Sequence, residues 1–261
     1  MINQFHLNGM EIVDFNNEIC DGNMKKILIT GGKGNFATNI SHFAQKMNYS
    51  VLNPSKNEMD IRNYSNIDNY FHRFHPNFEY VIHAAALTTP MAQHKKEIKL
   101  SIETNIIGTG NVVIACEKFN KKIIYISSNY VYPGNEGNYD EDSYLKPFNE
   151  YAWSKLGGEC SVHLYHNSLI LRICMNRKPF PHPKALVDVK SSFIYNDDAA
   201  RITLKLIDEI GIINIGGKEQ SIYEFVKDQN PSIGKIKRMD VKDVEMGINS
   251  SINISKMESL L

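Results

Sequence analysis

Short apolar runs alternate with longer amphipathic stretches along most of the chain, and this order limits the folds that are open to it. The runs have little polar alternation, which is typical of strands that helices cover on both faces. They occupy residues 25–30, 50–53, 79–86, 121–128 and 169–173. The stretches with helical spacing are 36–47, 64–74, 97–119 and 150–165. This order predicts an α/β fold with a doubly wound parallel sheet.

The chain divides into three parts by pattern. Residues 1–23 form a polar, Asn-rich extension, and the regular pattern runs from 24 to 173. Residues 174–261 are looser, with a proline-spaced loop at 177–184 and a strand-like run at 211–215. We interpret this last part as a small substrate-binding region, partly interleaved with the main domain. The 261 residues, 42% of them hydrophobic, are sufficient for a sizeable core.

The overall charge argues against two classes of partner. Lys and Arg number 29 and Asp and Glu also number 29, so neither a nucleic acid nor a membrane surface is expected as a partner. No apolar run approaches the roughly 18 residues of a membrane span. The first residues lack a secretory signal pattern and the four cysteines lack CxxC spacing, so we expect a cytoplasmic protein without a metal site.

A glycine-rich turn follows the first apolar run. Gly32, Gly34 and Ala37 form a G-x-G-x-x-A pattern, overlapped by Gly31 and followed by a helix from about Asn35. Glycines allow the backbone to approach a pyrophosphate closely, and the N–H groups at the start of the helix, such as that of Phe36, favour negative charge. The position between strand and helix therefore predicts a dinucleotide-binding domain over residues 24–173.

The second run does not end in the acidic residue that commonly binds the adenosine ribose. Asn53, Ser55 and Lys56 occupy this place. A hydroxyl and a cation accept a 2′-phosphate better than a carboxylate does, so the sequence favours NADP over NAD. Asp60 and Ile61 follow and are candidates to flank the adenine, although Asp60 is equally typical of a helix N-cap.

Tyr151 and Lys155 lie four residues apart on a predicted helix and therefore share a face. A neighbouring cation lowers the pKa of a phenol, which suits Tyr151 to proton transfer. Ser128 ends the run at 121–128, at the edge where open α/β sheets bind ligands, and is a candidate hydrogen-bond donor to a carbonyl. Asn105 is a candidate to hold its helix through a water or backbone contact, the alternative being an exposed polar face.

Together these motifs resemble the extended short-chain dehydrogenase/reductase superfamily, and within it the dTDP-4-dehydrorhamnose reductase-like (RmlD-like) nucleotide-sugar enzymes. The segments that carry the resemblance are TGGKGNFA (30–37), HAAALT (83–88), NIIGTGNVVIAC (105–116), SSNYVYPG (127–134) and YAWSKLGGE (151–159). It implies a Rossmann-type fold and an NADP or NAD cofactor, with Ala84, Ala85 and Ala86 beside the cofactor.

The resemblance implies reduction of the keto group of a nucleotide-linked deoxy sugar, in the synthesis of surface-polysaccharide precursors. Ser128, Tyr151 and Lys155 match the family's catalytic trio: Tyr151 protonates the developing alkoxide, Ser128 hydrogen-bonds it, and Lys155 binds the nicotinamide ribose. The alternatives are a nucleotide-sugar 4-epimerase or dehydratase that retains NAD, and a non-catalytic regulatory subunit that binds a dinucleotide.

Polar residues near the ends of the strands are the candidates for binding the substrate. They are Thr88, Thr89, Ser128, Asn129, Tyr132 and Arg177. The resemblance further implies a homodimer that pairs through helices such as those carrying Asn105 and Tyr151. The segment at 172–180 and the short C-terminal part depart from the family pattern, and they leave the identity of the sugar open.

Overall fold

The computed structural model describes residues 24–88, 90–241 and 246–261, and its centre is one sheet of six parallel strands. The strand order across the sheet is β2-β1-β3-β4-β5-β10. The strands are β1 (Lys26–Thr30), β2 (Ser50–Leu52), β3 (Tyr80–His83), β4 (Lys122–Ser128), β5 (Ser168–Ile173) and β10 (Gly211–Ile215). This confirms the predicted doubly wound parallel sheet.

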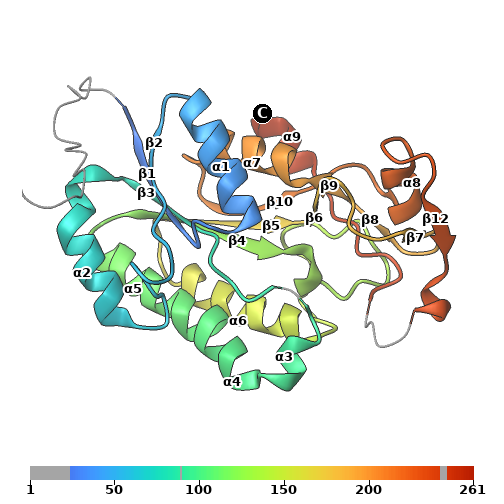
Figure 1. The fold of residues 1–261 in the computed structure, drawn as a ribbon, viewed down its shortest axis with the longest axis horizontal. Helices are drawn as coiled ribbons and strands as arrows, with labels where there is room; N and C mark the ends of the chain where they lie inside the picture. The colour runs from blue at the N-terminus through green and yellow to red at the C-terminus, as the bar shows by residue number, and fades with distance from the viewer. Residues whose placement is uncertain (1–23, 89, 242–245) are drawn as a thin grey trace, which may run out of the picture.

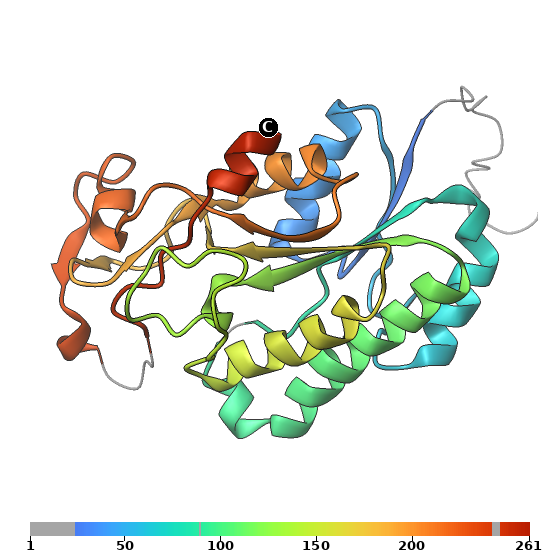
Figure 2. The ribbon, with the colours of Figure 1, turned by 180° about the vertical axis from the view of Figure 1, so that it is seen from behind.

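Helices cover both faces of the sheet (Figures 1 and 2). One face is covered by α1 (Asn35–Lys46), α7 (Asn196–Lys205) and α9 (Ser255–Leu260), and the other by α2 (Tyr64–Phe74), α5 (Gly108–Lys118) and α6 (Glu150–His163). Successive strand residues alternate between these layers, since Ile124 packs into the core beneath α1 and α7 whereas Tyr125 packs into the core beneath α2 and α5. This double burial explains the continuous apolar runs in the sequence.

The helical stretch expected over 97–119 is divided in the structure. It begins with the short helices α3 (Gln93–Lys96) and α4 (Ile98–Ser101), passes through a π-helical segment over Ile102–Ile107, and continues as α5. Isolated π-helical turns inside a helix occur frequently at functional sites. Asn105 lies within this turn, and its side chain bonds outside the helix, as described below.

The region after Ile173 both completes the main sheet and extends beyond it. The run at 211–215 is β10, which pairs in parallel with β5 at the edge of the sheet. The remaining strands form two-stranded pairs, β6 (Met175–Asn176) with β9 (Ile194–Tyr195), β7 (Lys184–Leu186) with β12 (Gly234–Ile236), and β8 (Lys190–Ser191) with β11 (Gln220–Ser221). With α8 (Ile222–Lys227) they enclose a third hydrophobic core.

Three single-turn 3-10 helices complete the described elements: His75–Asn77, Asn129–Val131 and Arg238–Asp240. Within the described ranges, no helix has the length and apolar character needed to cross a bilayer.

Candidate active site

The glycine turn after β1 packs tightly against two neighbouring strand ends. Gly31 has a φ of +71°, and a Cβ there would lie 2.8 Å from the Cα of Ala85, after β3. A Cβ on Gly32 would lie 2.4 Å from the carbonyl oxygen of Asn53, after β2. The turn therefore needs glycine at both positions, and its backbone lies at the carboxyl edge of the sheet.

Helix α1 starts directly from this turn with an open N-terminus. Gly34 is its N-cap residue and donates its N–H to the Gly31 carbonyl oxygen at 2.8 Å. Among the described residues, no side chain caps the helix and its first turn holds no acidic residue. The Phe36 ring packs into the core, while the Asn35 side chain accepts a hydrogen bond from Asn196 at 2.7 Å. The N–H groups and the positive end of α1 thus suit a phosphate.

The end of β2 differs from the expectation at Ser55. The Ser55 N–H and hydroxyl both donate to the carboxylate of Glu58, at 2.7 and 2.6 Å. This bond holds the pKa of Glu58 below its usual value, so the carboxylate is charged at neutral pH. The side chain of Lys56 is exposed. The residues predicted to accept a 2′-phosphate therefore include a hydroxyl that a carboxylate already binds.

Asp60 and Ile61 occupy the following turn. Arg62 donates to both oxygens of Asp60, with a shortest distance of 2.6 Å, and this holds the Asp60 pKa below its usual value. The Ile61 side chain is buried in the core beneath α2 and α5, where it fills the space beside Gly108. Asp60 thus pairs with Arg62 rather than capping α2, whose N-cap is Asn63.

Asn105 connects three parts of the site through its side-chain amide. Its oxygen accepts from the Leu87 N–H at 2.7 Å, and its nitrogen donates to the Leu87 carbonyl at 2.9 Å and to the Ser154 hydroxyl at 2.8 Å. Ser154 in turn donates to the Tyr151 carbonyl at 2.7 Å. The alternative of an exposed polar face is thereby excluded, because Asn105 is buried and its backbone contacts fix the loop after β3 against α6. It is a positioning residue.

Ser128 and Tyr151 meet at the carboxyl end of β4. The Ser128 hydroxyl is near enough to that of Tyr151 to favour the phenolate form, although burial raises the Tyr151 pKa to about 12. The Tyr151 ring packs against His94, at 5.4 Å between centroids, and against Tyr130, at 6.3 Å. A phenol in this environment keeps its proton at neutral pH, which is the form that a proton donor requires.

Lys155 is buried one turn beyond Tyr151, but its ammonium does not produce the predicted lowering of the Tyr151 pKa. Burial and the Ser128 hydroxyl are the causes that act on Tyr151. The Lys155 Nζ lies instead 4.1 Å from the centroid of the Tyr125 ring, on the neighbouring strand. Burial lowers the Lys155 pKa to about 7, and the charge of Glu159 partly opposes this effect.

A buried chain of hydrogen bonds supports the same region from beneath. His83 lies between the hydroxyls of Thr30, at 2.7 Å from Nδ1, and Thr109, at 3.0 Å from Nε2. Thr30 accepts from the Ala85 N–H at 3.1 Å, and Thr109 donates to the Asn105 carbonyl at 2.8 Å. Burial lowers the His83 pKa to about 3, so His83 is neutral and joins the cofactor turn to the π-helical segment.

A buried ion pair lies one helical turn beyond Lys155. Arg172 on β5 contacts Glu159 on α6 through Nε at 3.0 Å and through Nη2, and the side chains are only 3% and 4% exposed. Ser127 donates to the other Glu159 oxygen at 2.8 Å. Sequence reasoning missed this pair and Tyr125. Glu159 follows Lys155 by four residues, a spacing that indicates a shared helix face, but nothing in the sequence pattern identifies Arg172 as its partner.

The predicted substrate residues separate in the structure. Tyr132 is fully buried, donates to Asn214 at 2.9 Å and accepts from Arg172 at 2.8 Å, so its hydroxyl is directed into the protein. The buried Asn129 donates to the Ser250 carbonyl at 3.0 Å and ties the strand end to the C-terminal segment. Thr88 and Arg177 are exposed. Thr89 lies outside the described residues.

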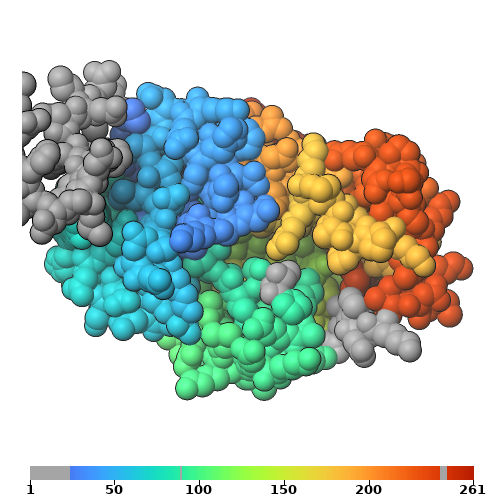
Figure 3. All heavy atoms as spheres, in the orientation of Figure 1, coloured from blue at the N-terminus to red at the C-terminus, as the bar shows by residue number. Residues whose placement is uncertain are grey.

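Two cavities lie in the C-terminal region. One, of about 230 Å³, is lined by Lys178, Pro179, Phe180, Tyr195, Val226, Gln229 and Asn230, and Arg177 precedes the first of these in the chain. In Figure 3, the yellow segment that includes residues 177–184 lies against the orange C-terminal part, which carries the other lining residues. The walls are partly aromatic, and Lys178 carries a positive charge.

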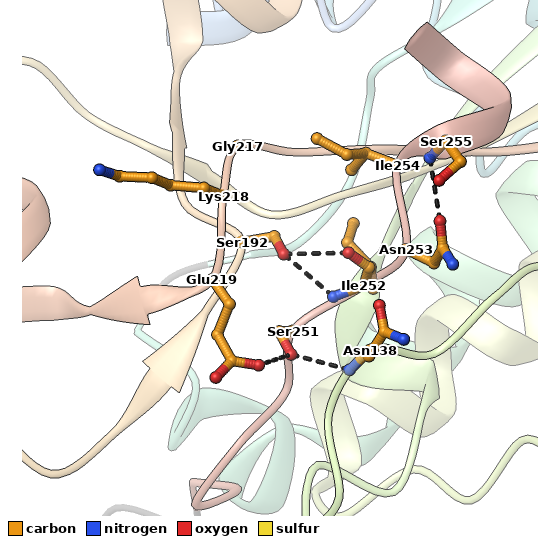
Figure 4. Close-up of a pocket in the computed structure, with 10 residues that line it drawn as sticks. All are labelled: Asn138, Ser192, Gly217, Lys218, Glu219, Ser251, Ile252, Asn253, Ile254 and Ser255. Atoms are coloured by element: carbon orange, nitrogen blue, oxygen red, sulfur yellow. Dashed lines mark hydrogen bonds between the residues drawn. The ribbon is translucent and has the colours of Figure 1, made fainter. Parts of the chain in front are cut away.

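The second cavity, of about 210 Å³, is polar and lies between the 216–219 turn and the 251–255 segment (Figure 4). Its groups bond to one another: Ser251 donates to Glu219 at 2.7 Å, and Ser192 donates to the Ile252 carbonyl at 3.1 Å. None of the predicted site residues lines it. We interpret it as part of the packing between the C-terminal segment and the strand pairs.

Comparisons with known proteins give relatives of this chain. The dTDP-4-dehydrorhamnose reductase of Aggregatibacter actinomycetemcomitans is 30% identical over 152 residues, or 57% of this chain and 51% of the relative. A dTDP-D-glucose 4,6-dehydratase of Dictyostelium discoideum is 27% identical over 220 residues, which cover 69% of this chain and 50% of that protein. The chain thus spans about half the length of these curated relatives.

A solved structure shares the fold over nearly the whole chain. The dTDP-4-dehydrorhamnose reductase of Bacillus anthracis, crystallised with NADP, superimposes with a TM-score of 0.81 at 23% identity, covering 92% of each chain. The sequence profile described as the RmlD substrate binding domain matches residues 24–175, which contain the glycine turn, Ser128, Tyr151 and Lys155. This match confirms the resemblance in the sequence, and the chain belongs to the RmlD substrate binding domain family.

Proposed function

We propose that this protein is an NAD(P)-dependent reductase of the keto group of a nucleotide-linked deoxy sugar, acting in the synthesis of polysaccharide precursors. The observation that carries the proposal is that Ser128 and Tyr151 lie side by side at the strand edge, with Lys155 buried one helical turn away. The reductase names of a relative and of a structural neighbour support it.

The residues present fit a dinucleotide. Gly31 and Gly32 keep the turn flat against the strand ends, and the N-terminus of α1 is open to a pyrophosphate. We propose that Lys155 binds the nicotinamide ribose. When bound, the reduced dinucleotide supplies the hydride for the ketone carbon.

The chain's own residues handle the proton. As the ketone is reduced, negative charge develops on its oxygen. Ser128 donates a hydrogen bond to that oxygen, and Tyr151 transfers its phenolic proton to it. Asn105 keeps the Tyr151 turn of α6 fixed against the loop after β3 while this occurs.

Cofactor preference depends on two opposite charges after β2. We expect Lys56→Glu to lower the ratio of kcat/KM for NADPH to that for NADH by about tenfold or more, because a charge-assisted bond to the 2′-phosphate is lost. Glu58→Gln should raise the same ratio, because the carboxylate bound to Ser55 repels a phosphate. Steady-state kinetics with both cofactors measures this. If neither substitution changed the ratio, Lys56 and Glu58 would not belong to the cofactor site.

For the substrate, we propose that its nucleoside diphosphate lies toward the cavity beside Arg177 and Lys178. A cavity lined by Phe180 and Tyr195 provides aromatic faces for a base, and Lys178, which also lines it, suits a diphosphate together with the exposed Arg177 next to it in the chain. Tyr132 has no place in this proposal because its hydroxyl is bonded inside the protein.

The test of the function is a panel of nucleoside diphosphate 4-keto sugars, offered to the purified chain with NADPH or NADH. We expect oxidation of the nicotinamide with at least one of them and formation of the corresponding hydroxyl sugar. Isomerised or dehydrated sugar without net oxidation would indicate the epimerase or dehydratase instead. Dinucleotide binding without any conversion would favour the regulatory subunit.

A homodimer is our proposal for the assembly. Exposed apolar side chains gather on the helices α4, α5 and α6 and the π-helical segment, namely Ile98, Ile102, Ile107, Ile114 and Trp153. Such a surface is typical of an interface between copies. We expect Trp153→Glu to reduce the mass in light scattering to that of a monomer. Ile210→Glu, at another exposed apolar residue, should leave the dimer intact, and a monomeric wild type would contradict the proposal.

A further inference from the structure

Tyr125 lies at the centre of the sheet, on the face covered by α5 and α6, and has no exposed surface. The Lys155 Nζ is 4.1 Å from the centroid of its ring, well within the roughly 6 Å over which an aromatic face attracts a cation. The Tyr125 hydroxyl donates to the backbone carbonyl of the same lysine at 3.0 Å. One side chain therefore contacts both ends of Lys155.

The helix approaches Tyr125 unusually closely at this point. A Cβ on Gly158 would lie 2.6 Å from the Tyr125 hydroxyl oxygen and 2.5 Å from the Asn105 carbonyl oxygen. A larger residue at 158 would push α6 away from the strand. Gly158 thus allows the helical turn that carries Lys155 to pack directly against the Tyr125 hydroxyl.

Two titratable groups near Lys155, Glu159 and His83, do not compete with the Tyr125 ring for its ammonium. Glu159, on the same helix, favours the ammonium, but its oxygens are bonded to Arg172 and Ser127. From β3, His83 stacks against the Tyr125 ring at 5.7 Å between centroids and is neutral at neutral pH. Burial also raises the pKa of Tyr125 well above its usual value, so the ring stays uncharged.

We propose that Tyr125 is a positioning residue for Lys155: its ring stabilises the buried ammonium and its hydroxyl fixes the helical turn that presents it. The role assigned to Lys155 rests on the proposed function, whereas the contact itself does not. The electrostatic part of the contact depends on the negative potential of the ring face. Weakening that potential should therefore lower the pKa of Lys155 even if the protein catalyses another reaction.

The experiment measures the Lys155 titration directly. The full chain is labelled with ¹³C-lysine, the Cε signal of Lys155 is assigned by its loss in Lys155→Met, and its shift is followed against pH by NMR. We expect a wild-type midpoint of about 7. Tyr125→Phe keeps the ring and should leave the midpoint nearly unchanged. Tyr125→Leu removes the ring and should lower it by about one pH unit.

A second series keeps the shape of the ring, because Tyr125→Leu is a large change in a packed core. Phenylalanines with increasing numbers of fluorine atoms are introduced at position 125. Each fluorine makes the electrostatic potential of the ring face less negative, while the volume of the ring stays nearly constant. The Lys155 midpoint should fall stepwise with fluorination. A midpoint that is the same throughout the series would overturn the proposal, whatever the variants do to enzymatic activity.

Turnover provides an independent readout. If the proposed reductase function holds, Tyr125→Phe should lower kcat, because the bond that fixes the turn of Lys155 is lost. Strong fluorination should in addition move the alkaline decline of kcat to lower pH, because protonated Lys155 is then lost earlier. If the panel of sugars shows no turnover while the NMR midpoint still follows fluorination, the proposed function fails and the role of Tyr125 stands.

Discussion

Tyr151→Phe is expected to bind NADPH with the affinity of the wild type and to lose turnover by about 10²–10⁴-fold, the usual contribution of a positioned general acid. The substitution removes one oxygen and retains the ring, whose contacts with His94 and Tyr130 hold it in place. The hydroxyl that is lost is the one beside Ser128. Dinucleotide binding by fluorescence and kcat on the best sugar of the panel measure the two effects separately.

Tyr130→Phe is the matched control. Its ring lies beside that of Tyr151 and packs against Phe148 at 5.0 Å, so the substitution deletes a hydroxyl in the same neighbourhood. We expect its turnover to stay close to that of the wild type. If Tyr151→Phe retained full turnover, Tyr151 would not be the proton donor. If both variants lost turnover equally, the loss would reflect a disturbed site rather than a missing proton.

The order of the elements and the closeness of Ser128 to Tyr151 could be predicted because they depend on local patterns. Continuous apolar runs gave the buried strands, and the spacing of Tyr151 and Lys155 gave a shared helix face. Parallel strands bring their carboxyl ends to one edge, so Ser128 was placed near Tyr151 without a structure.

Tertiary partners could not be predicted in the same way. The pKa of Tyr151 was expected to fall because a cation stands four residues away, yet burial dominates and Lys155 lies on Tyr125. Tyr132 was predicted to bind the substrate because it is a polar residue near the end of a strand. In the structure, Arg172 and Asn214 bind its hydroxyl inside the protein. Such outcomes depend on residues distant in sequence, and spacing alone contains no information about them.

Arg172→Met is expected to lower the free energy of unfolding by about 3–5 kcal/mol, because it leaves the Glu159 carboxylate buried without its cation. Arg172 also donates to Tyr132 at 2.8 Å and to the Glu141 carbonyl at 3.0 Å, and so joins α6 to the loop after β4. Urea unfolding at neutral pH measures the loss. Lys25→Met, which breaks the exposed pair with Asp208, serves as the control and should cost far less.

The double variant Glu159→Met, Arg172→Met separates the ion pair from packing. The attraction between two buried charges offsets little more than the free energy of desolvating them. Removing both charges should therefore restore much of the stability that Arg172→Met alone loses. The recovered free energy is then the penalty of an unpaired buried carboxylate. A double variant as unstable as the sum of its single variants would contradict this account, since the loss would then come from packing and from the bonds to Tyr132 and Ser127.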